Sequence, residues 1–249
     1  MYYLLTECLI IKNENQYLHE HILTNARAGI DFFYIYDNES TIPVYDYLKE
    51  TAPELLKICS VERYSAPPDC KNPQSECYKK FLSEHKNGQT WCAFIDTDEM
   101  FSGNLKQFCK ENENTANLLI FKGFIIGANN KAFYENKPLK ERFNNDIIKR
   151  WSYNKNVVQT RFLIEQSAHK SILTPSNFLT IYYPENVRLL HYYYKSLEEY
   201  IWKIQRGSAQ NTIRRFKNFF DDNKINENDV KILMNKYKID FDFCTYNNK

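Results

Sequence analysis

Strand-like and helix-like segments alternate through the first 127 residues, and this alternation constrains the fold more than any other feature. Apolar, β-branched and aromatic runs that predict strands are separated by stretches whose apolar residues have helical spacing. Helices between successive strands are typical of a largely parallel sheet covered on both faces. The predicted strands are 3–11, 31–40, 57–64, 90–101 and 116–127, and the predicted helices are 15–29, 44–56, 72–88 and 105–114.

Two helix starts carry specific signals. Asn72 is a candidate cap, and Pro73 after it suits the first helical position. Ser196 is followed three residues later by Glu199, which is the pattern of a capping box, and Gly207 is expected to end that helix. These signals predict where the two helices begin.

The second half of the chain gives weaker signals. Residues 128–185 look like loops, turns and short β segments, and 185–196 returns to strand character. Amphipathic helical segments follow residue 207, and no long linker separates them from the rest. The predicted organisation is one domain at 1–207, with halves at 1–127 and 128–207, and a helical extension of the same domain at 208–249.

Composition narrows the class of protein. A formal net charge of +2 gives no electrostatic case for nucleic acid as a partner. The seven cysteines are scattered without a CxxC pair, which argues against a disulfide framework or a zinc site and favours reduced thiols in a cytoplasmic protein. The chain shows no signal peptide and no run of about 18 apolar residues, so any membrane association is expected to be peripheral.

Polar clusters follow three of the predicted strands. These clusters are "KNEN" after the first strand, "DNES" after the second and "DTDE" after the fourth. Ligands of parallel α/β sheets bind at the carboxyl ends of the strands. The sequence therefore predicts a polar ligand site at this edge.

Asp96 and Asp98 are the strongest candidates for chemistry. On extended backbone, residues i and i+2 face the same side, so both carboxylates can address one cation. Oxygen ligands suit Mg²⁺ or Mn²⁺, which complete their shells with water and substrate phosphates. The alternative is a simple acidic turn, and Glu99 has no assigned role.

The other polar residues have structural alternatives. Glu14, Asp37 and Asn38 can accept hydrogen bonds from a nucleobase and a ribose. The alternative is that Asn13 or Asn15 caps the following helix and that Asp37 and Asn38 only form a turn. His191 can ligate a metal or pack against its aromatic neighbours, and Lys195 can approach a diphosphate or stay in solvent.

Several segments, taken together and in order, resemble glycosyltransferase family 92 and its bacterial relatives, which are close to the family 2 type of GT-A fold. They lie within residues 10–207. The matching segments are "IIKNENQYLHEHI", "GIDFFYIYDNES", "PQSECYKKFL", "WCAFIDTDEMF", "KGFIIGANN" and "LLHYYYKSLEEYIWKIQRG".

The resemblance implies an α/β, GT-A type, Rossmann-like, mostly parallel sheet flanked by helices, with a helical C-terminal segment. It implies a metal-dependent inverting glycosyltransferase that moves a sugar from a nucleotide sugar, with UDP favoured, to a hydroxyl of a glycan, glycolipid or glycoprotein. The implied cofactor is Mn²⁺ or Mg²⁺, and the implied role is surface glycan biosynthesis, in the cytoplasm or at the inner face of the membrane. Residues 1–127 would be the nucleotide-sugar half, and 128–207 the acceptor half that also closes the metal site.

Residue roles follow from the same resemblance. The residues expected to contact the donor are Glu14, Asp37 and Asn38 in the nucleoside pocket, Gln74 and Asp96 near the ribose or diphosphate, and Lys195 at the diphosphate. The metal is expected at Asp98 and His191, with Asp96 contacting it or its bound water.

The sequence alone does not identify the general base that takes the proton from the acceptor hydroxyl, because its identity depends on geometry. Glu165 ranks first among the candidates, ahead of Asp146 and Glu141. His169 could instead contact the acceptor or the donor sugar.

Two other functions compete with this reading. A sugar-phosphate nucleotidyltransferase typically carries a Gly-rich phosphate loop near its start, whereas residues 1–28 contain no glycine. A non-catalytic carbohydrate-binding or assembly protein could use the 19 tyrosines to stack on sugars, although core packing explains them more simply.

Overall fold

The chain divides into two compact units. The computed structural model describes residues 3–144, 146–174, 179–207 and 215–239. The first unit comprises Met1–Ile125 and Lys149–His191, and the second comprises Ile126–Ile148 and Tyr192–Lys249. The predicted domain at 1–207, its halves at 1–127 and 128–207, and the extension at 208–249 divide the chain by role and stay predictions.

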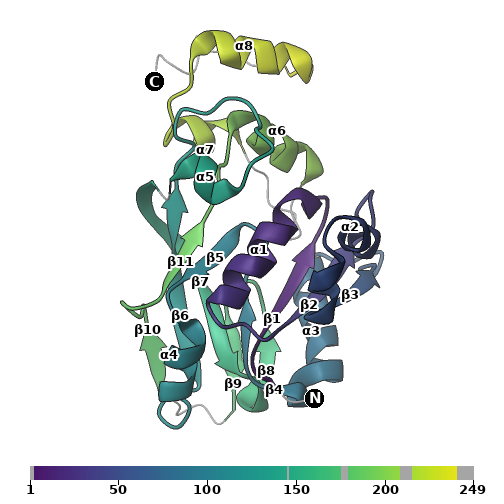
Figure 1. Ribbon diagram of the computed structural model, residues 1–249, viewed down its shortest axis with the longest axis vertical. Coiled ribbons are helices and arrows are strands. Elements are labelled where there is room, and N and C mark those ends of the chain that lie inside the picture. The colour runs from purple at the N-terminus through teal and green to yellow at the C-terminus, as the bar shows by residue number, and fades with distance from the viewer. Residues whose placement is uncertain (1–2, 145, 175–178, 208–214, 240–249) are drawn as a thin grey trace. The chain divides into compact units, whose positions relative to one another are not determined.

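Within the described residues, the first unit holds a nine-stranded sheet (Figure 1). The strands are β1 (Tyr3–Ile11), β2 (Phe32–Asn38), β3 (Cys59–Tyr64), β4 (Gln89–Phe94), β5 (Glu99–Ser102), β6 (Leu118–Ile126), β7 (Ile147–Gln159), β10 (Thr180–Tyr182) and β11 (Arg188–His191). Their order is β3-β2-β1-β4-β7-β6-β11-β5, with β10 also beside β6. Strands β3, β2, β1 and β4 are mutually parallel, as are β6, β10 and β11, whereas β7 runs antiparallel to β4 and β5 antiparallel to β11. The predicted α/β class with a mostly parallel sheet is confirmed.

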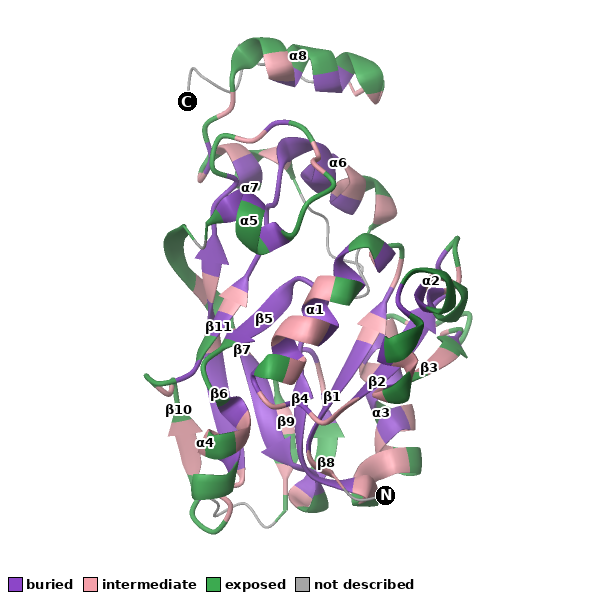
Figure 2. Cartoon of the chain, viewed as in Figure 1, coloured by how far each residue is buried: buried purple, intermediate pink, exposed green. Residues whose placement is uncertain are grey.

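Helices cover both faces of this sheet because its strands are apolar on both sides. The helices of the first unit are α1 (Asn15–Arg27), α2 (Val44–Thr51), α3 (Pro73–His85) and α4 (Leu105–Glu111), with 3₁₀ turns at η1 (Pro53–Lys57), η2 (Lys86–Gly88) and η3 (Thr160–Phe162). In β1, Leu5 and Leu9 join the core under α1, α2 and α4, whereas Cys8 joins the core under α3. Figure 2 shows the buried central strands between these layers.

The predicted start of α3 is confirmed. The Asn72 side chain accepts a hydrogen bond from the Ser75 backbone N–H at 3.1 Å, and Pro73 is the first helical residue. This cap satisfies one of the backbone donors that a helix leaves free at its start.

Replacing Asn72 with alanine is expected to lower the free energy of unfolding by about 1 kcal/mol, because the cap bond is lost. Urea denaturation measures this change. Asn87→Ala is the matched control, since Asn87 is exposed just after the same helix, and it is expected to leave the denaturation midpoint in place. Equal midpoints for the Asn72→Ala variant and the wild type would show that the cap adds nothing.

The single strand predicted at 90–101 is wrong. Two strands, β4 and β5, occupy this stretch, and a turn lies between them in which the Glu99 N–H donates to the Asp96 carbonyl at 2.9 Å. The chain changes course here because β5 pairs with β11 at the far end of the strand order. Asp96 and Asp98 therefore lie on a turn and not on a strand. The prediction that their carboxylates face one side, as residues i and i+2 of a strand do, does not apply to them.

Residues 128–185 contain a longer strand than the short β segments predicted. β7 spans 13 residues, and the burial of its first half is low on both sides. Alternation of apolar and polar residues marks a strand that is buried on one face. Because this half of β7 is buried on neither face, the segment "KRWSYNKN" lacks that pattern. After β7, β8 (Leu163–Gln166) and β9 (Ser171–Leu173) form a separate antiparallel pair.

The second unit contributes four helices in its described residues, joined by loops and turns. Its helices are α5 (Leu139–Phe143), α6 (Leu197–Arg206), α7 (Phe216–Phe220) and α8 (Glu227–Lys236). The predicted capping box is present, because the Ser196 hydroxyl and the Glu199 carboxylate each accept from the other residue's backbone N–H. Glu199 also receives two bonds from the buried Arg142, at 2.6 and 2.9 Å. The predicted helical C-terminal segment is confirmed, although 208–214 and 240–249 lie outside the described residues.

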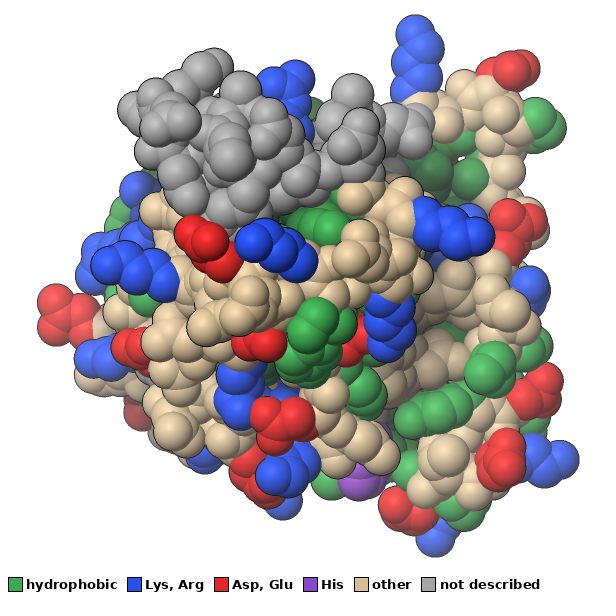
Figure 3. All heavy atoms as spheres, turned by 90° about the horizontal axis from the view of Figure 1, so that it is seen from above, with side chains coloured by type: hydrophobic (Ala, Val, Ile, Leu, Met, Phe, Trp, Pro, Cys, Tyr) green, Lys and Arg blue, Asp and Glu red, His purple; other side chains and the backbone are tan. Residues whose placement is uncertain are grey.

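Charged side chains of both signs lie on the face of the molecule seen from above (Figure 3). Lys, Arg, Asp and Glu side chains are interspersed over the face drawn in Figure 3. Of the helices that the structure describes, none has both the length and the apolar character needed to cross a membrane.

Candidate functional site

The polar strand ends meet as the sequence predicts. β2, β1 and β4 are adjacent and parallel, so their carboxyl ends share one edge. The loops after β1 and β2 bond to each other there: the Asn13 N–H donates to the Ser40 hydroxyl at 2.9 Å, and the Asn13 side chain accepts from the Thr41 N–H at 2.8 Å.

Asp37 forms hydrogen bonds within the protein at this edge of the sheet. Its carboxylate accepts from the backbone N–H groups of Ser40 at 2.8 Å and Val44 at 3.1 Å, and from Arg63 at 3.1 Å. These bonds hold the turn after β2 and the start of α2. The turn alternative therefore describes Asp37, and its contact with a nucleoside stays a prediction.

Two further predicted donor residues lie at the same edge. Asn38 is the last residue of β2 and is buried. Glu14 precedes α1, and its backbone carbonyl accepts from the Tyr17 N–H at 3.0 Å. Their predicted nucleoside contacts also stay predictions.

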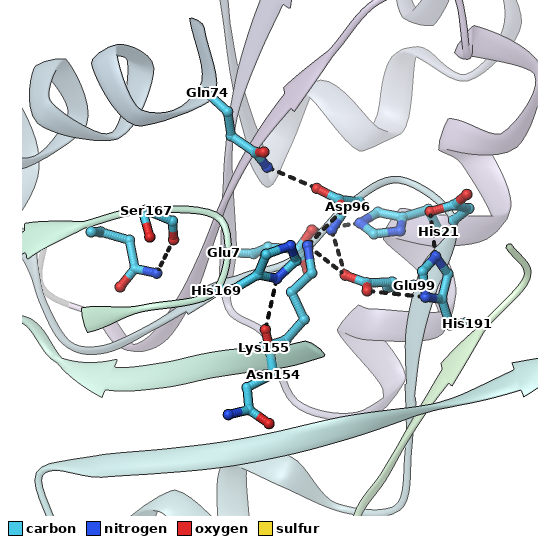
Figure 4. A network of polar contacts seen from close by, with 12 residues as sticks. Glu7, His21, Gln74, Asp96, Glu99, Asn154, Lys155, Ser167, His169 and His191 are labelled. Carbon is cyan, nitrogen blue, oxygen red and sulfur yellow. Dashed lines mark hydrogen bonds and ion pairs between the residues drawn. The ribbon is translucent and has the colours of Figure 1, made fainter. Parts of the chain in front are cut away.

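A cluster of charged side chains surrounds the turn between β4 and β5 (Figure 4). We name it the carboxylate cluster, and its members are Asp96, Asp98, Glu99, Lys155 and His191. The Lys155 ammonium lies 2.6 Å from Asp96 Oδ2 and 3.1 Å from Glu99 Oε2. The Lys155 side chain is only 1% exposed, so this cation is built into the interior.

Gln74 reaches the same cluster from the first turn of α3. Its amide Nε2 donates to Asp96 Oδ1 at 2.9 Å and to the Tyr78 hydroxyl at 2.9 Å. Both Asp96 oxygens therefore accept hydrogen bonds, one from Gln74 and one from Lys155. The carboxylate is held in place while its side chain stays 40% exposed.

His191 enters the cluster from the end of β11, where it is the cross-strand partner of Glu99. Its Nε2 lies 3.4 Å from Asp98 Oδ1, and its Nδ1 lies 3.5 Å from Glu99 Oε1. The edge of the imidazole ring contacts Trp151, with the ring centroids 5.2 Å apart. Gly123 leaves room for this pair, because a Cβ there would lie 3.3 Å from the His191 Cβ.

A second buried network, made of hydrogen bonds, supports the turn between β4 and β5. Glu7, in the middle of β1, lies 2.5 Å from His21 Nε2 and accepts from Asn25 at 3.2 Å. The Asn25 side chain in turn accepts from the Phe101 N–H at 2.9 Å. The network therefore ties β1 and α1 to β5, which carries Glu99.

The charges in the cluster shift one another's ionisation. Although loss of solvation opposes ionisation of Asp96, the neighbouring Lys155 lowers the pKa of this carboxyl group. Burial outweighs Lys155 at Glu99 and raises its pKa. Burial alone would lower the pKa of Lys155, but Asp96 and Glu99 raise it, so this side chain stays charged.

The donor set at Asp98 and His191 fits a divalent cation in part. A carboxylate and an imidazole, both buried and 3.4 Å apart, are suitable ligands for Mn²⁺. Over the described residues, no three His, Cys, Asp or Glu side chains are arranged to hold a metal ion. The pair therefore suits an ion whose shell is completed by substrate oxygens and water, and Asp96 is less suited because both its oxygens are engaged.

His169 lies beside the cluster. Its Nδ1 is 2.9 Å from the Asn154 carbonyl oxygen, and its ring stacks on Tyr153 with centroids 4.9 Å apart. A carbonyl only accepts, so Nδ1 carries the proton and the neutral ring keeps its lone pair on Nε2. Burial lowers the pKa of His169, and the charges of Lys155 and Asp96 act on it.

The predicted base Glu165 belongs to the first unit, like the carboxylate cluster. It is exposed on β8, opposite Ile172 of β9, and its charge acts on Lys79 of α3. Lys195 belongs to the second unit, where it is buried and has a φ of 56°. The catalytic role of Glu165 and the diphosphate contact of Lys195 stay predictions.

Sequence reasoning missed four polar members of these networks: Lys155, Glu7, His21 and Asn25. A signal existed for three of them. Glu7 interrupts the apolar run "YLLTECLII", and His21 and Asn25 lie four residues apart on one face of the next helix. A buried acid on a strand needs partners, and this pair could have supplied them.

No family model matches the chain. A stretch of 102 residues is 34% identical to a glycosyltransferase family 92 protein of Ricinus communis. The stretch makes up 40% of this chain and 16% of that relative, so the chain spans a small part of the relative's length. The predicted resemblance to glycosyltransferase family 92 is confirmed over this stretch.

Three solved structures share part of the chain's arrangement. A mannosyltransferase from Pyrobaculum calidifontis, in complex with GDP-Man and Mn²⁺, is 11% identical with a TM-score of 0.48, over 77% of this chain and 57% of that one. HddC from Yersinia pseudotuberculosis is 10% identical with a TM-score of 0.45, over 78% and 99%. S. aureus TarS in complex with UDP is 11% identical with a TM-score of 0.42, over 72% and 60%.

Proposed function

We propose that this protein is a glycosyltransferase of GT-A type, which moves a sugar from a nucleotide sugar to a hydroxyl of a glycan, glycolipid or glycoprotein. The observation that carries the proposal is the convergence of Asp96, Asp98 and His191 beside the carboxyl ends of parallel strands. The local identity to a family 92 relative supports it. UDP is the favoured nucleotide, and we place the activity in surface glycan synthesis, in the cytoplasm or at the inner face of the membrane.

Asp98 and His191 would hold a divalent cation, Mn²⁺ or Mg²⁺. Such an ion, when bound, neutralises the charge that develops on a diphosphate leaving group. Asp96 would accept hydrogen bonds from the ribose on its exposed side. Gln74 and Lys155 fix the direction of its carboxylate, and Lys155 keeps the carboxyl group ionised.

We propose an inverting reaction with His169 as the general base. The acceptor hydroxyl gives its proton to a base as its oxygen attacks the anomeric carbon, and the bond from that carbon to the diphosphate breaks. His169 offers a free lone pair on Nε2 beside the cluster, whereas the charge of Glu165 acts on Lys79 of α3. This geometry favours His169 over the base ranked first from sequence.

The two candidate bases are separated by the pH dependence of the rate. His169→Ala is expected to lower the rate of transfer by roughly 10²- to 10⁴-fold and to remove the acidic limb of its pH profile. Glu165→Gln is expected to change neither. A large loss in Glu165→Gln with an unchanged pH profile in His169→Ala would return the role to Glu165.

A product assay tests the proposed function itself. The protein is incubated with Mn²⁺ and UDP-linked galactose, glucose or rhamnose, and the nucleotide product is identified by chromatography. Release of UDP with loss of the sugar supports glycosyl transfer, and inversion is read from the anomeric configuration of the product. In a second incubation with UTP and a sugar 1-phosphate, release of pyrophosphate would indicate a nucleotidyltransferase. Glycan binding without turnover of any nucleotide sugar would indicate a binding protein.

A further inference from the structure

A groove opens in the first unit where β6 changes partners. β6 pairs with β10 through Leu118–Ile120 and with β11 through Gly123–Ile125. The connection from β10 to β11 passes beside β6 between these two stretches and leaves a groove of about 330 Å³. This volume lies at the lower end of the range of small-molecule sites.

Three cations and three aromatic rings line this groove. The Arg150 and Arg188 guanidinium groups lie 5.2 and 5.7 Å from the centroid of the Phe124 ring, and the Lys122 ammonium lies 5.0 Å from that of Tyr183. Both guanidinium groups therefore contact the same ring.

The cations of the groove are not neutralised by nearby acids. In the described part of the chain, no carboxylate lies within ion-pair distance of Lys122, Arg150 or Arg188. Among the lining residues, the acid is Glu185. The groove therefore carries a net positive charge, which complements an anion.

The groove faces away from the carboxylate cluster. Side chains alternate along a strand, so Arg188 and His191 of β11 point to opposite faces of the sheet. The same alternation in β6 separates Phe124 from Gly123, which lies against His191. A ligand in the groove is therefore separate from one at the cluster.

We propose that this groove binds an anionic saccharide, meaning a sugar that carries a phosphate or a carboxylate. Guanidinium groups match the geometry of either anion with paired N–H donors. The rings of Phe124 and Tyr183, which line the groove, offer apolar contact to the C–H faces of a sugar. A concave site of this size suits a ligand of one or two sugar units better than it suits a flat membrane surface. Binding of such a ligand does not depend on glycosyl transfer.

Calorimetry on the full chain tests the site with four probes: glucose 6-phosphate, glucuronate, glucose and inorganic phosphate. Saturable binding is expected for the two anionic sugars, with glucose and inorganic phosphate at least roughly tenfold weaker. Arg150→Gln and Arg188→Gln are each expected to weaken the anionic sugars by roughly tenfold or more, since each removes a charge-assisted bond.

Arg161→Gln is the matched control, because Arg161 stacks on Phe162 at 4.5 Å and lies outside the groove lining. It is expected to bind as the wild type does, and so is Asp98→Asn, which keeps this test independent of glycosyl transfer. Anionic sugars that fail to bind, or that bind both groove variants unchanged, would overturn the site. Equal affinity for inorganic phosphate and glucose 6-phosphate would overturn its preference for saccharides.

Discussion

Asp98→Asn is expected to abolish the Mn²⁺ dependence of UDP binding and to lower the rate of sugar transfer by roughly 10²- to 10³-fold. The substitution keeps the size of the side chain but removes the negative charge that would face the cation. Asp98 is buried beside His191 Nε2. After replacement of Asp98 with a neutral amide, the His191 imidazole is the remaining strong ligand of the pair for the cation. Calorimetry with UDP at increasing Mn²⁺ and a UDP-release assay measure the two effects.

Asp46→Asn is the control for this change, because Asp46 is an exposed aspartate on α2. Its UDP affinity and its rate are expected to equal those of the wild type. Wild-type Mn²⁺ dependence in the Asp98→Asn protein would show that the metal is held elsewhere. Circular dichroism on both variants confirms that the comparison is between folded proteins.

Lys155→Met is expected to lower the free energy of unfolding by about 3–5 kcal/mol, the cost of removing one partner from a buried ion pair. Lys155 is the cation that neutralises Asp96 and the fully buried Glu99. Without it, the interior retains carboxylates whose loss of solvation is no longer offset. Urea denaturation at neutral pH measures the loss.

Two variants define the source of this loss. Lys79→Met removes a lysine from an exposed ion pair with Glu76 and is expected to leave the denaturation midpoint unchanged. The double change Lys155→Met with Glu99→Gln is expected to recover part of the stability, because the stranded buried charge is gone. A double variant no more stable than Lys155→Met would show that lost packing, not stranded charge, causes the effect.

Features set by local physics could be predicted from the sequence. The caps at Asn72 and Ser196 depend on residues three positions away, so their patterns are visible in the chain. The strands that are apolar on both faces, such as β1 and β4, also stood out. The meeting of the polar strand ends followed because adjacent parallel strands end at one edge.

Features set by distant partners could not be predicted in this way. The turn at Asp96 exists because β5 pairs with β11, which lies almost ninety residues later in the chain. Lys155 lies in the buried half of β7. The other half is exposed and lacks the apolar pattern by which a strand is predicted, so β7 is not recognised as one long strand. The role of Lys155 depends on Asp96 and Glu99 and is invisible without the fold. The proximity of His191 to Asp98 was expected from family resemblance and not from spacing.

The strand order also bears on how the chain is synthesised and folded. β7 inserts between β4 and β6, and β11 inserts between β6 and β5, although both are made after the strands that flank them. A ribosome adds about 5–20 residues per second, so β5 and β6 wait several seconds for β11. Their edges stay unpaired during this interval, and unpaired edges are sites of aggregation. Slower translation before residue 188 is therefore expected to reduce soluble yield, and a chaperone that shields strand edges is expected to restore it.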